Sequence, residues 1–225
     1  MRKIPVISID GLSGSGKSTI SKKLSKILGY YILDSGILYR TFAYLQTSKK
    51  IESFNVENIN SLIKDLTLDP NKELSFNILY ENNDITSNLY YEEVGLLASS
   101  ISKNETIRSA LLPLQHACLR APGLIANGRD MGTKVFPDSK LKIFITADLD
   151  IRAKRRYEQL IKKGLKVNLI DIRNSLQDRD EKDINRDISP LKAAKDAIII
   201  DSSQLNVESV LDKILELYNI KELEI

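Results

Sequence analysis

The feature that most constrains this chain of 225 residues is a glycine-rich loop near its N-terminus. Residues 11–18 read Gly-Leu-Ser-Gly-Ser-Gly-Lys-Ser, which fits the pattern of Gly, four residues, Gly, Lys, and Ser or Thr. An apolar run at residues 4–10 precedes the loop, and a segment with helical spacing at residues 18–28 follows it. A strand, a loop and a helix in this order can surround a phosphate chain with backbone amides. The sequence therefore predicts a binding site for a nucleoside triphosphate.

Each part of the loop has an expected role toward ATP. Lys17 should reach the β and γ phosphates, and the hydroxyl of Ser18 should help to bind Mg²⁺, the cofactor that accompanies ATP. A glycine-rich turn without a ligand is the alternative, and the flanking strand and helix argue against it. The expected ATP-binding residues are Gly11, Leu12, Ser13, Gly14, Ser15, Gly16, Lys17, Ser18 and Thr19, with Ser18 as the metal residue.

Short apolar runs recur along the chain and alternate with helical segments. The runs lie at residues 4–10, 30–33, 124–126, 141–147 and 197–200, and the helical segments at 18–28, 36–46, 105–120 and 148–163. Strands that are apolar throughout and separated by helices are typical of a parallel sheet covered on both faces. The predicted fold class is therefore α/β. Pro113 predicts a kink or an early end in its helix.

One stretch interrupts this alternation. Segments around residues 66–68 and 74–80, with turn-prone residues at 82–84, predict an inserted, mostly β subdomain. Gly164 predicts the end of the basic helix before it, and the polar residues nearby suggest a movable lid. We expect a single catalytic domain over residues 1–225, with a core at 1–50 and 93–225, an insert at about 51–92 and a lid at about 156–168.

Composition and charge restrict the protein's surroundings and partners. A net charge of +3 gives no excess of basic residues for bulk nucleic-acid binding. The single cysteine, Cys118, can form no internal disulfide, which favours a reducing compartment. The apolar run near the N-terminus is too short for a secretory signal, and no run approaches membrane-spanning length. The sequence predicts a cytoplasmic protein.

Two polar segments follow predicted strands and are candidates for an acceptor site. Residues 34–36, with Tyr39 and Arg40, begin a helix whose free amides and guanidinium suit an anion; a capped surface helix with a solvated arginine is the alternative. Residues 128–132 read Gly-Arg-Asp-Met-Gly and follow the next strand; a salt-bridged turn is the alternative. In a parallel sheet, both segments would share one edge with the glycine-rich loop.

A third group of residues is basic and lies on two helices. It comprises Arg152, Arg155 and Arg156, then Gly164, then Arg179, Asp183 and Arg186. Arginines at such spacing are commonly a solvated helix face. In phosphoryl transfer, however, cations that close over the migrating group stabilise its charge and exclude water.

The loop alone does not distinguish a kinase from other nucleotide-binding proteins. No Asn-Lys-x-Asp sequence for guanine recognition occurs, and no apolar strand ends in Asp-Glu. A small-molecule kinase is therefore favoured, with AMP, GMP, UMP or shikimate among its alternative acceptors. A noncatalytic, nucleotide-dependent RNA-binding module is a more distant alternative. Only Tyr157 lies near the basic residues, which argues against stacking on bases.

These motifs resemble those of the bacterial cytidylate kinases over nearly the whole chain. The resemblance rests on residues 9–18, 33–36 with Tyr39 and Arg40, 128–133, and 179–191 with Arg179-Asp180, Asn185-Arg186 and Ser189-Pro190-Leu191. The first motif is shared by many families, whereas Gly-Arg-Asp-Met-Gly-Thr and Asn-Arg with Pro-Leu are specific. The chain departs from the family at residues 86–90, where Tyr90 stands in place of the usual arginine.

The resemblance implies a nucleoside monophosphate kinase fold with a five-stranded parallel core, an inserted β subdomain on the acceptor side and a short lid. It implies transfer of a phosphoryl group from ATP to CMP or dCMP. We expect the protein to be a monomer that binds neither nucleic acid nor membrane. The acceptor phosphate would contact Ser35, Tyr39, Arg40, Arg129 and Arg186. The cytosine would contact Ser99, Arg108 and Asp130, and the ribose would contact Arg179 and Asp183. Ser100 is the alternative to Ser99. The expected catalytic residues are Lys17, Arg129, Arg152, Arg156 and Arg186.

Overall fold

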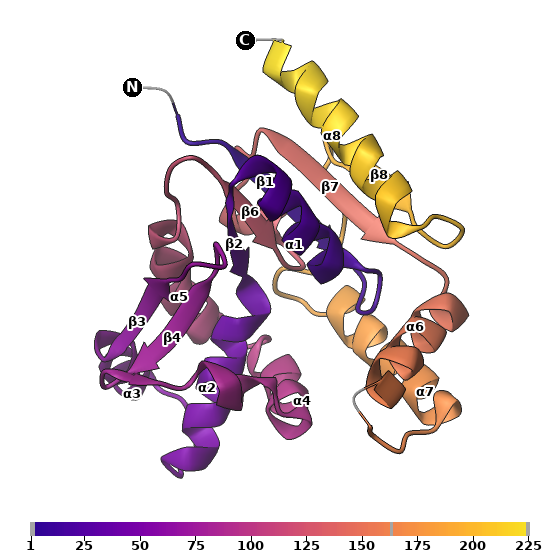
Figure 1. The fold of residues 1–225 in the computed structure, drawn as a ribbon. Helices are drawn as coiled ribbons and strands as arrows, with labels where there is room; N and C mark the ends of the chain where they lie inside the picture. The colour runs from indigo at the N-terminus through magenta and orange to yellow at the C-terminus, as the bar shows by residue number, and fades with distance from the viewer. Residues whose placement is uncertain (1–2, 163, 224–225) are drawn as a thin grey trace.

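The structure, a computed structural model, describes residues 3–162 and 164–223. Its centre is a five-stranded sheet in the order β2-β6-β1-β7-β8, in which every pair is parallel (Figure 1). The predicted α/β class and the parallel core are confirmed. The strands are β1 (Val6–Gly11), β2 (Tyr31–Asp34), β6 (Leu124–Asn127), β7 (Leu141–Thr146) and β8 (Ile198–Asp201).

Helices cover both faces of this sheet because its strands are apolar on both sides. On one face, Ile9 and Ile143 are buried with residues of α1 (Lys17–Leu28) and α8 (Val207–Leu223). On the other face, Leu33 and Ala126 are buried with residues of α2 (Ser35–Ser48) and α5 (Glu105–Ala117). Each Å² of apolar surface removed from water stabilises the fold by about 25 cal/mol, so these two layers are the main source of stability. The layers therefore support a rigid edge at the carboxyl ends of the strands.

The predicted insertion is a small antiparallel sheet together with a helix. The sheet has the order β3-β4-β5, and η1 follows it. The amide of Ile32 in β2 donates to the carbonyl oxygen of Leu74 over 2.7 Å, so the insertion contacts the edge of the core sheet. Its elements are α3 (Val56–Lys64), β3 (Leu66–Pro70), β4 (Phe76–Tyr80), β5 (Asn83–Asp84) and η1 (Thr86–Tyr90).

Helix α3 was not predicted, although the sequence encodes its start. The side chain of Asn55 accepts from the amide of Asn58, whose side chain accepts from the amide of Asn55 in return. This reciprocal pair satisfies two amides that the first turn leaves without helical partners. Ile59 and Leu62 then bury one face of the helix.

The remaining helices correct one prediction and confirm another. Helix α5 continues through Pro113 to Ala117, so the predicted early end is wrong. Helix α6 ends at Lys162, two residues before Gly164, whose φ of +78° confirms it as a stop signal. Position 163 of the expected lid lies outside the described residues. The other helices are α4 (Glu92–Ile101), α6 (Leu149–Lys162), α7 (Leu169–Ile184) and the π-helical turn η2 (Met131–Val135).

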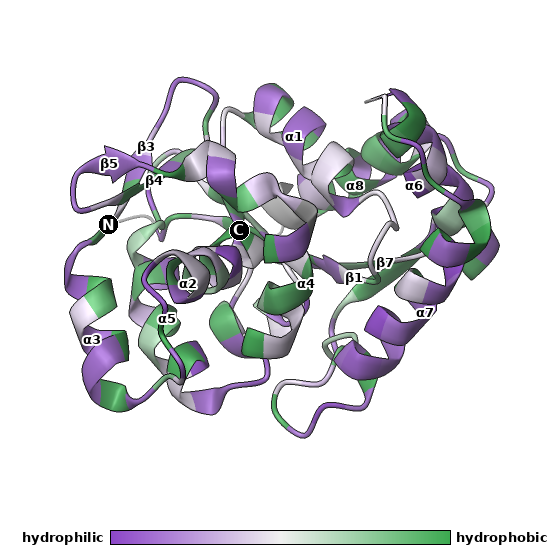
Figure 2. Cartoon of the chain, turned by 90° about the horizontal axis from the view of Figure 1, so that it is seen from below, coloured by the Kyte–Doolittle hydropathy of each residue, from purple (hydrophilic) through white to green (hydrophobic). Residues whose placement is uncertain are grey.

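Apart from α1 and α8, the helices form two groups near the carboxyl ends of the core strands (Figure 1). Figure 2 shows α6 and α7 on one side and α2, α3, α4 and α5 with the small sheet on the other. Within the described residues, no helix is both long enough and apolar enough to cross a membrane. The carboxyl ends of the core strands point toward the space between the two groups.

Gly11, the last residue of β1, can be replaced by no other residue without strain. Its φ is +143°, and a Cβ atom would lie 1.9 Å from the carbonyl oxygen of Ile145 on the paired strand. Gly11→Ala should lower the free energy of unfolding by about 2–4 kcal/mol in urea denaturation. Gly164→Ala is the matched control, because φ there is also positive but nothing lies within 4 Å. The control should lose only about 1 kcal/mol; equal losses would contradict the steric argument.

Candidate active site

The glycine-rich loop joins β1 to α1 and surrounds the side chain of Lys17. Gly14 and Gly16 have φ values of +76° and +96°, which glycine adopts readily. Lys17 is buried, and its Nζ donates to the carbonyl oxygen of Leu12 over 2.6 Å. Burial, and next the neighbouring charge of Arg129, lower the pKa of Lys17 well below its usual value. An anion at the loop would relieve both effects, which suits this lysine to a phosphate chain.

Arg152, on α6, contacts the backbone of the glycine-rich loop. Its Nε donates to the carbonyl oxygen of Ala147 over 2.8 Å, and its NH1 to that of Ser13 over 3.0 Å. NH1 also pairs with Asp180 on α7, and both side chains are buried. In this conformation the arginine therefore supports the loop and connects it to α7. Sequence reasoning expected a lid residue here and missed Asp180.

A second arginine on α6 also supports the loop, through Ser202, which directly follows β8. Arg155 donates to the hydroxyl and the carbonyl oxygen of Ser202 over 3.1 and 2.6 Å. The hydroxyl of Ser202 in turn donates to the carbonyl oxygen of Ser15 over 3.1 Å. The neighbouring Arg156 is half-buried and donates to Gln159 over 2.8 Å. Thr19, the last expected ATP-binding residue, is exposed.

The surroundings of Ser18 fit a magnesium ion that ATP carries. Ser18 is exposed beside the loop, and its Oγ accepts from Nδ2 of Asn127 over 3.2 Å. Oδ1 of Asn127 is buried and has no partner among the described residues. Oxygen ligands suit Mg²⁺, which usually takes only one or two protein groups beside phosphates and water. Within residues 3–162 and 164–223, no group of three or more His, Cys, Asp or Glu could bind a metal.

Arg129 and Asp130 follow β6, and they do not pair with each other. Nε of Arg129 donates to Asp183 on α7 over 3.0 Å, and NH1 of Arg186 lies 3.9 Å from the other oxygen of Asp183. Asp130 instead pairs with NH2 of Arg108 on α5, with both side chains buried. A merely salt-bridged turn is therefore wrong for residues 128–132. The two adjacent side chains reach opposite walls of one site.

Tyr39 lies against the Arg108–Asp130 pair. The guanidinium carbon of Arg108 is 5.6 Å from the centre of the Tyr39 ring. Burial raises the pKa of Tyr39 to about 12, so its hydroxyl keeps its proton and can donate to an anion. Arg108 also donates to the carbonyl oxygen of Ser102, whose own hydroxyl donates to the carbonyl oxygen of Ser99. Ser99 is half-buried and Ser100 is exposed.

The start of α2 completes this side of the site. The side chain of Asp34 caps the helix by accepting from the amide of Gly36 over 3.1 Å. Ser35 is buried close to Gly128: a Cβ atom added to Gly128 would lie only 2.6 Å from Oγ of Ser35. Arg40 is not an ordinary solvated arginine, because NH1 donates to the carbonyl oxygens of Leu89 and Tyr91 over 2.9 and 3.2 Å.

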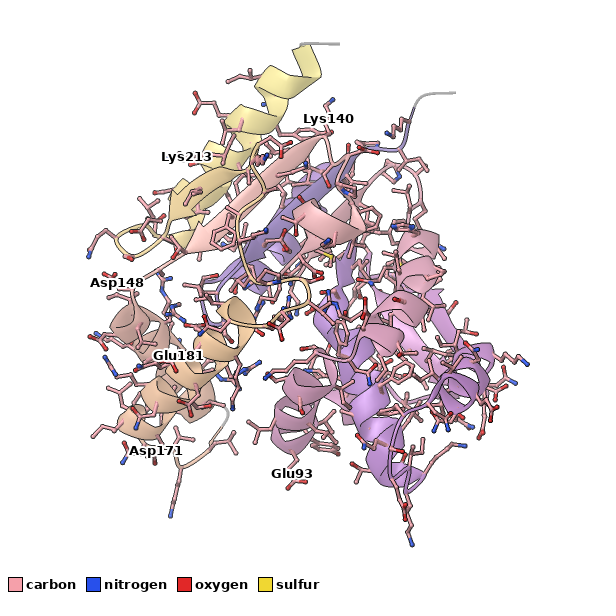
Figure 3. The ribbon with its side chains drawn as sticks, turned by 180° about the vertical axis from the view of Figure 1, so that it is seen from behind. Glu93, Lys140, Asp148, Asp171, Glu181 and Lys213 are labelled. Carbon is pink, nitrogen blue, oxygen red and sulfur yellow. The ribbon has the colours of Figure 1, made fainter. Side chains whose placement is uncertain are left out.

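One hollow lies between α7 and Lys103, just after α4, and a smaller one lies between α7 and Leu96 of α4. Their volumes are about 480 and 320 Å³; Arg186 lines the larger and Arg179 the smaller. Figure 3 shows Glu181 and Asp171 on α7, across from Glu93 at the start of α4. Burial lowers the pKa values of Arg179 and Arg186, and neighbouring arginines lower them further. The site therefore concentrates positive charge where an anionic ligand would offset it.

A parallel sheet whose glycine-rich loop faces this cluster of arginines defines the class of P-loop nucleotide-binding kinases. A family model described as cytidylate kinase matches residues 7–220. The chain is 44% identical over 224 residues to a cytidylate kinase of Pseudomonas fluorescens Pf-5, covering 98% of both chains. It is 43% identical to a cytidylate kinase of Azotobacter vinelandii, covering 93% of both. The chain belongs to the cytidylate kinase family.

Shikimate kinase from Acinetobacter baumannii in complex with shikimate has a TM-score of 0.48 and 17% sequence identity, covering 98% of this chain and 96% of that chain.

The buried Arg108–Asp130 pair should be costly to break from one side. Arg108→Ala leaves a buried carboxylate without its cation, so the free energy of unfolding should fall by about 3–5 kcal/mol in urea denaturation. Lys23→Ala is the control, because Lys23 pairs with Glu208 on the surface and should leave the midpoint unchanged. Adding Asp130→Ala to Arg108→Ala should restore part of the loss. A double variant as unstable as the sum of both changes would contradict the pairing.

Proposed function

We propose that this chain transfers the γ-phosphoryl group of ATP to CMP or dCMP, giving ADP and CDP or dCDP for pyrimidine metabolism. Family membership supports this reaction. The observation that carries it is the buried Arg108–Asp130 pair beside Tyr39, at the sheet edge that also carries Lys17. A carboxylate and a guanidinium together offer an acceptor and donors, which suits the amino, ring-nitrogen and carbonyl edge of cytosine.

ATP would bind at residues 11–19. The loop amides and Lys17 would contact the β and γ phosphates, as the burial of Lys17 and its lowered pKa favour an anion beside it. Mg²⁺ would be bound by Ser18 and the phosphates, with Asn127 orienting the serine hydroxyl. When bound, the metal would neutralise part of the phosphate charge during transfer.

The acceptor would lie between the two helix groups. Its phosphate would contact Ser35, Tyr39, Arg40, Arg129 and Arg186. Its base would contact Ser99, Arg108 and Asp130. Its ribose would contact Arg179 and Asp183. The hydrogen bond from Arg129 to Asp183 supports this arrangement, because it joins the proposed phosphate and ribose contacts. Tyr90, which lies near Asp34 and Arg40, would replace the family's usual arginine at the rim of the site.

Catalysis would need no general base. A CMP phosphate is largely a dianion near neutral pH, so its oxygen can attack the γ phosphorus directly. Positioning and neutralisation of charge then supply the rate enhancement. Lys17, Arg129, Arg156 and Arg186 would provide the cations. Arg152 would act at the loop itself, where it already contacts the carbonyl oxygen of Ser13.

The division of the chain follows from these assignments. Residues 1–50 and 93–225 would form the catalytic core, residues 51–92 the acceptor-side insert and residues 156–168 a lid. We further propose that the protein acts as a monomer in the cytoplasm.

A panel of acceptors tests the proposed reaction. ADP formation is measured with ATP and Mg²⁺ at a fixed concentration and CMP, dCMP, UMP, AMP, GMP or shikimate as acceptor. CMP or dCMP should give the highest kcat/KM, by about tenfold or more, because other bases do not present the amino group and ring nitrogen of cytosine to Asp130 and Arg108. A higher kcat/KM for a purine nucleotide or for shikimate would overturn the assignment.

The lysine of the loop provides a second test. Lys17→Ala should abolish CMP-dependent ADP formation while circular dichroism and the unfolding midpoint show a folded protein. Lys23→Ala is the matched control, because Lys23 lies on the same helix but is exposed. The control should retain wild-type turnover. Turnover by Lys17→Ala comparable to that of the control would refute the donor site.

A further inference from the structure

Asp10 connects the strand that leads into the glycine-rich loop to the segment that carries Arg129 and Asp130. It is 4% exposed and directly precedes Gly11 in β1. Its Oδ1 accepts from the amide of Met131 and its Oδ2 from the amide of Gly132, each over 2.8 Å. One carboxylate therefore binds the two amides that directly follow Asp130.

Packing allows this contact and limits its freedom. Gly132 lies so close to β1 that a Cβ atom would be 2.7 Å from Oγ of Ser8. The amide of Gly128, at the other end of the segment, donates to the carbonyl oxygen of Ile9 over 3.0 Å. Three successive residues of β1, Ser8, Ile9 and Asp10, thus contact residues 128–132. Of these three, only Asp10 contributes a charged side chain.

Asp10 interacts electrostatically with Lys17 of the proposed ATP site and with Asp130 of the proposed acceptor site. Burial raises the pKa of Asp10 to about 6, the bonds from Gly132 and Met131 oppose that rise, and Asp130 raises the pKa while Lys17 lowers it. A buried carboxylate is stable only where hydrogen bonds and cations compensate for lost water. The two amides and Lys17 supply that compensation.

We propose that Asp10 is a positioning residue of the acceptor site, which fixes Arg129 and Asp130 relative to the loop that binds ATP. The inference rests on the proposed function, because it assigns Arg129 and Asp130 to the acceptor. Asp10 touches neither substrate in this arrangement. It acts through the backbone of Met131 and Gly132, so its effect should appear in the acceptor's kinetics.

The variant Asp10→Asn separates this role from simple packing. Asparagine has nearly the same size but only one acceptor oxygen, so one of the two amides loses its partner. Its NH₂ group would face a backbone N–H, which favours a shift of residues 129–132. Since a displacement of about 1 Å can cost 100-fold in rate, kcat/KM for CMP should fall by about tenfold or more. The KM for ATP should change by less than about twofold.

Amide hydrogen exchange reports on the same contact without any substrate. In Asp10→Asn, the amides of Met131 and Gly132 should exchange about 10- to 100-fold faster, as expected for loss of a charged hydrogen-bond partner. The control is Ser25→Ala, on the part of α1 that is distant from the glycine-rich loop. It removes another buried hydrogen bond to the backbone, from the hydroxyl of Ser25 to the carbonyl oxygen of Tyr30. The control should lower stability without changing the KM for CMP or the exchange of these two amides.

A double-mutant cycle tests whether Asp10 acts through Asp130. Asp130→Ala alone should weaken the binding of CMP far more than the binding of ATP. If Asp10 positions Asp130, adding Asp10→Asn to Asp130→Ala should reduce kcat/KM for CMP by clearly less than it does in the wild-type background. Fully additive losses would overturn the positioning role.

The outcomes distinguish this inference from the proposed function. If the wild-type chain phosphorylates CMP, but Asp10→Asn has unchanged kinetics for CMP and unchanged exchange at Met131 and Gly132, the inference alone is wrong. A wild-type chain without activity on CMP would overturn the proposed function as well. Should Asp10→Asn not fold, Asp10→Glu receives the same measurements, since its longer carboxylate keeps the charge but displaces the two amides. A raised KM for CMP in that variant supports the inference, and an unchanged KM overturns it.

Discussion

The parallel pairing of β1 with β6 is the constraint on which the active site depends. Its register places Ile9 beside Asn127, and β2 pairs with β6 so that Asp34 also lies beside Asn127. β2 and β6 therefore end at one level, and β1 continues two residues farther, to Gly11. The polar residues that follow these strands meet at one edge. The apolar layers on both faces of the sheet prevent that register from slipping. Donor loop, acceptor helix and the segment after β6 thus obtain their relative positions from the core.

Sequence patterns predicted the strands of this core because period and flanking residues report burial directly. The strands ending near Asp10, Asp34 and Asn127 lie within two residues of their predicted positions. Helix α3 was missed because its start depends on two asparagines, Asn55 and Asn58, which also occur commonly in turns. Patterns of apolar spacing do not detect a cap made by side chains alone.

The sequence indicated which polar residues lie at strand ends, but it did not indicate their interaction partners. Motif positions indicated that Arg129 and Asp130 are polar residues at a strand end. The sequence did not reveal that their partners are Asp183 and Arg108, which lie on separate helices and meet them only through tertiary packing. Arg152 illustrates the same limit, since a basic helix face looks solvated until Asp180 of the neighbouring helix packs against it.

The crowding of arginines around Arg129 has a consequence for the protein without substrates. Their charges lower one another's pKa values, and Arg129 also disfavours the charged form of Lys17. In the protein without bound substrates, these like charges repel one another. A compact dianion would offset them, so we expect sulfate or phosphate in a buffer to raise the unfolding temperature. The thermal stability measured for this protein should therefore depend on the anions in the buffer.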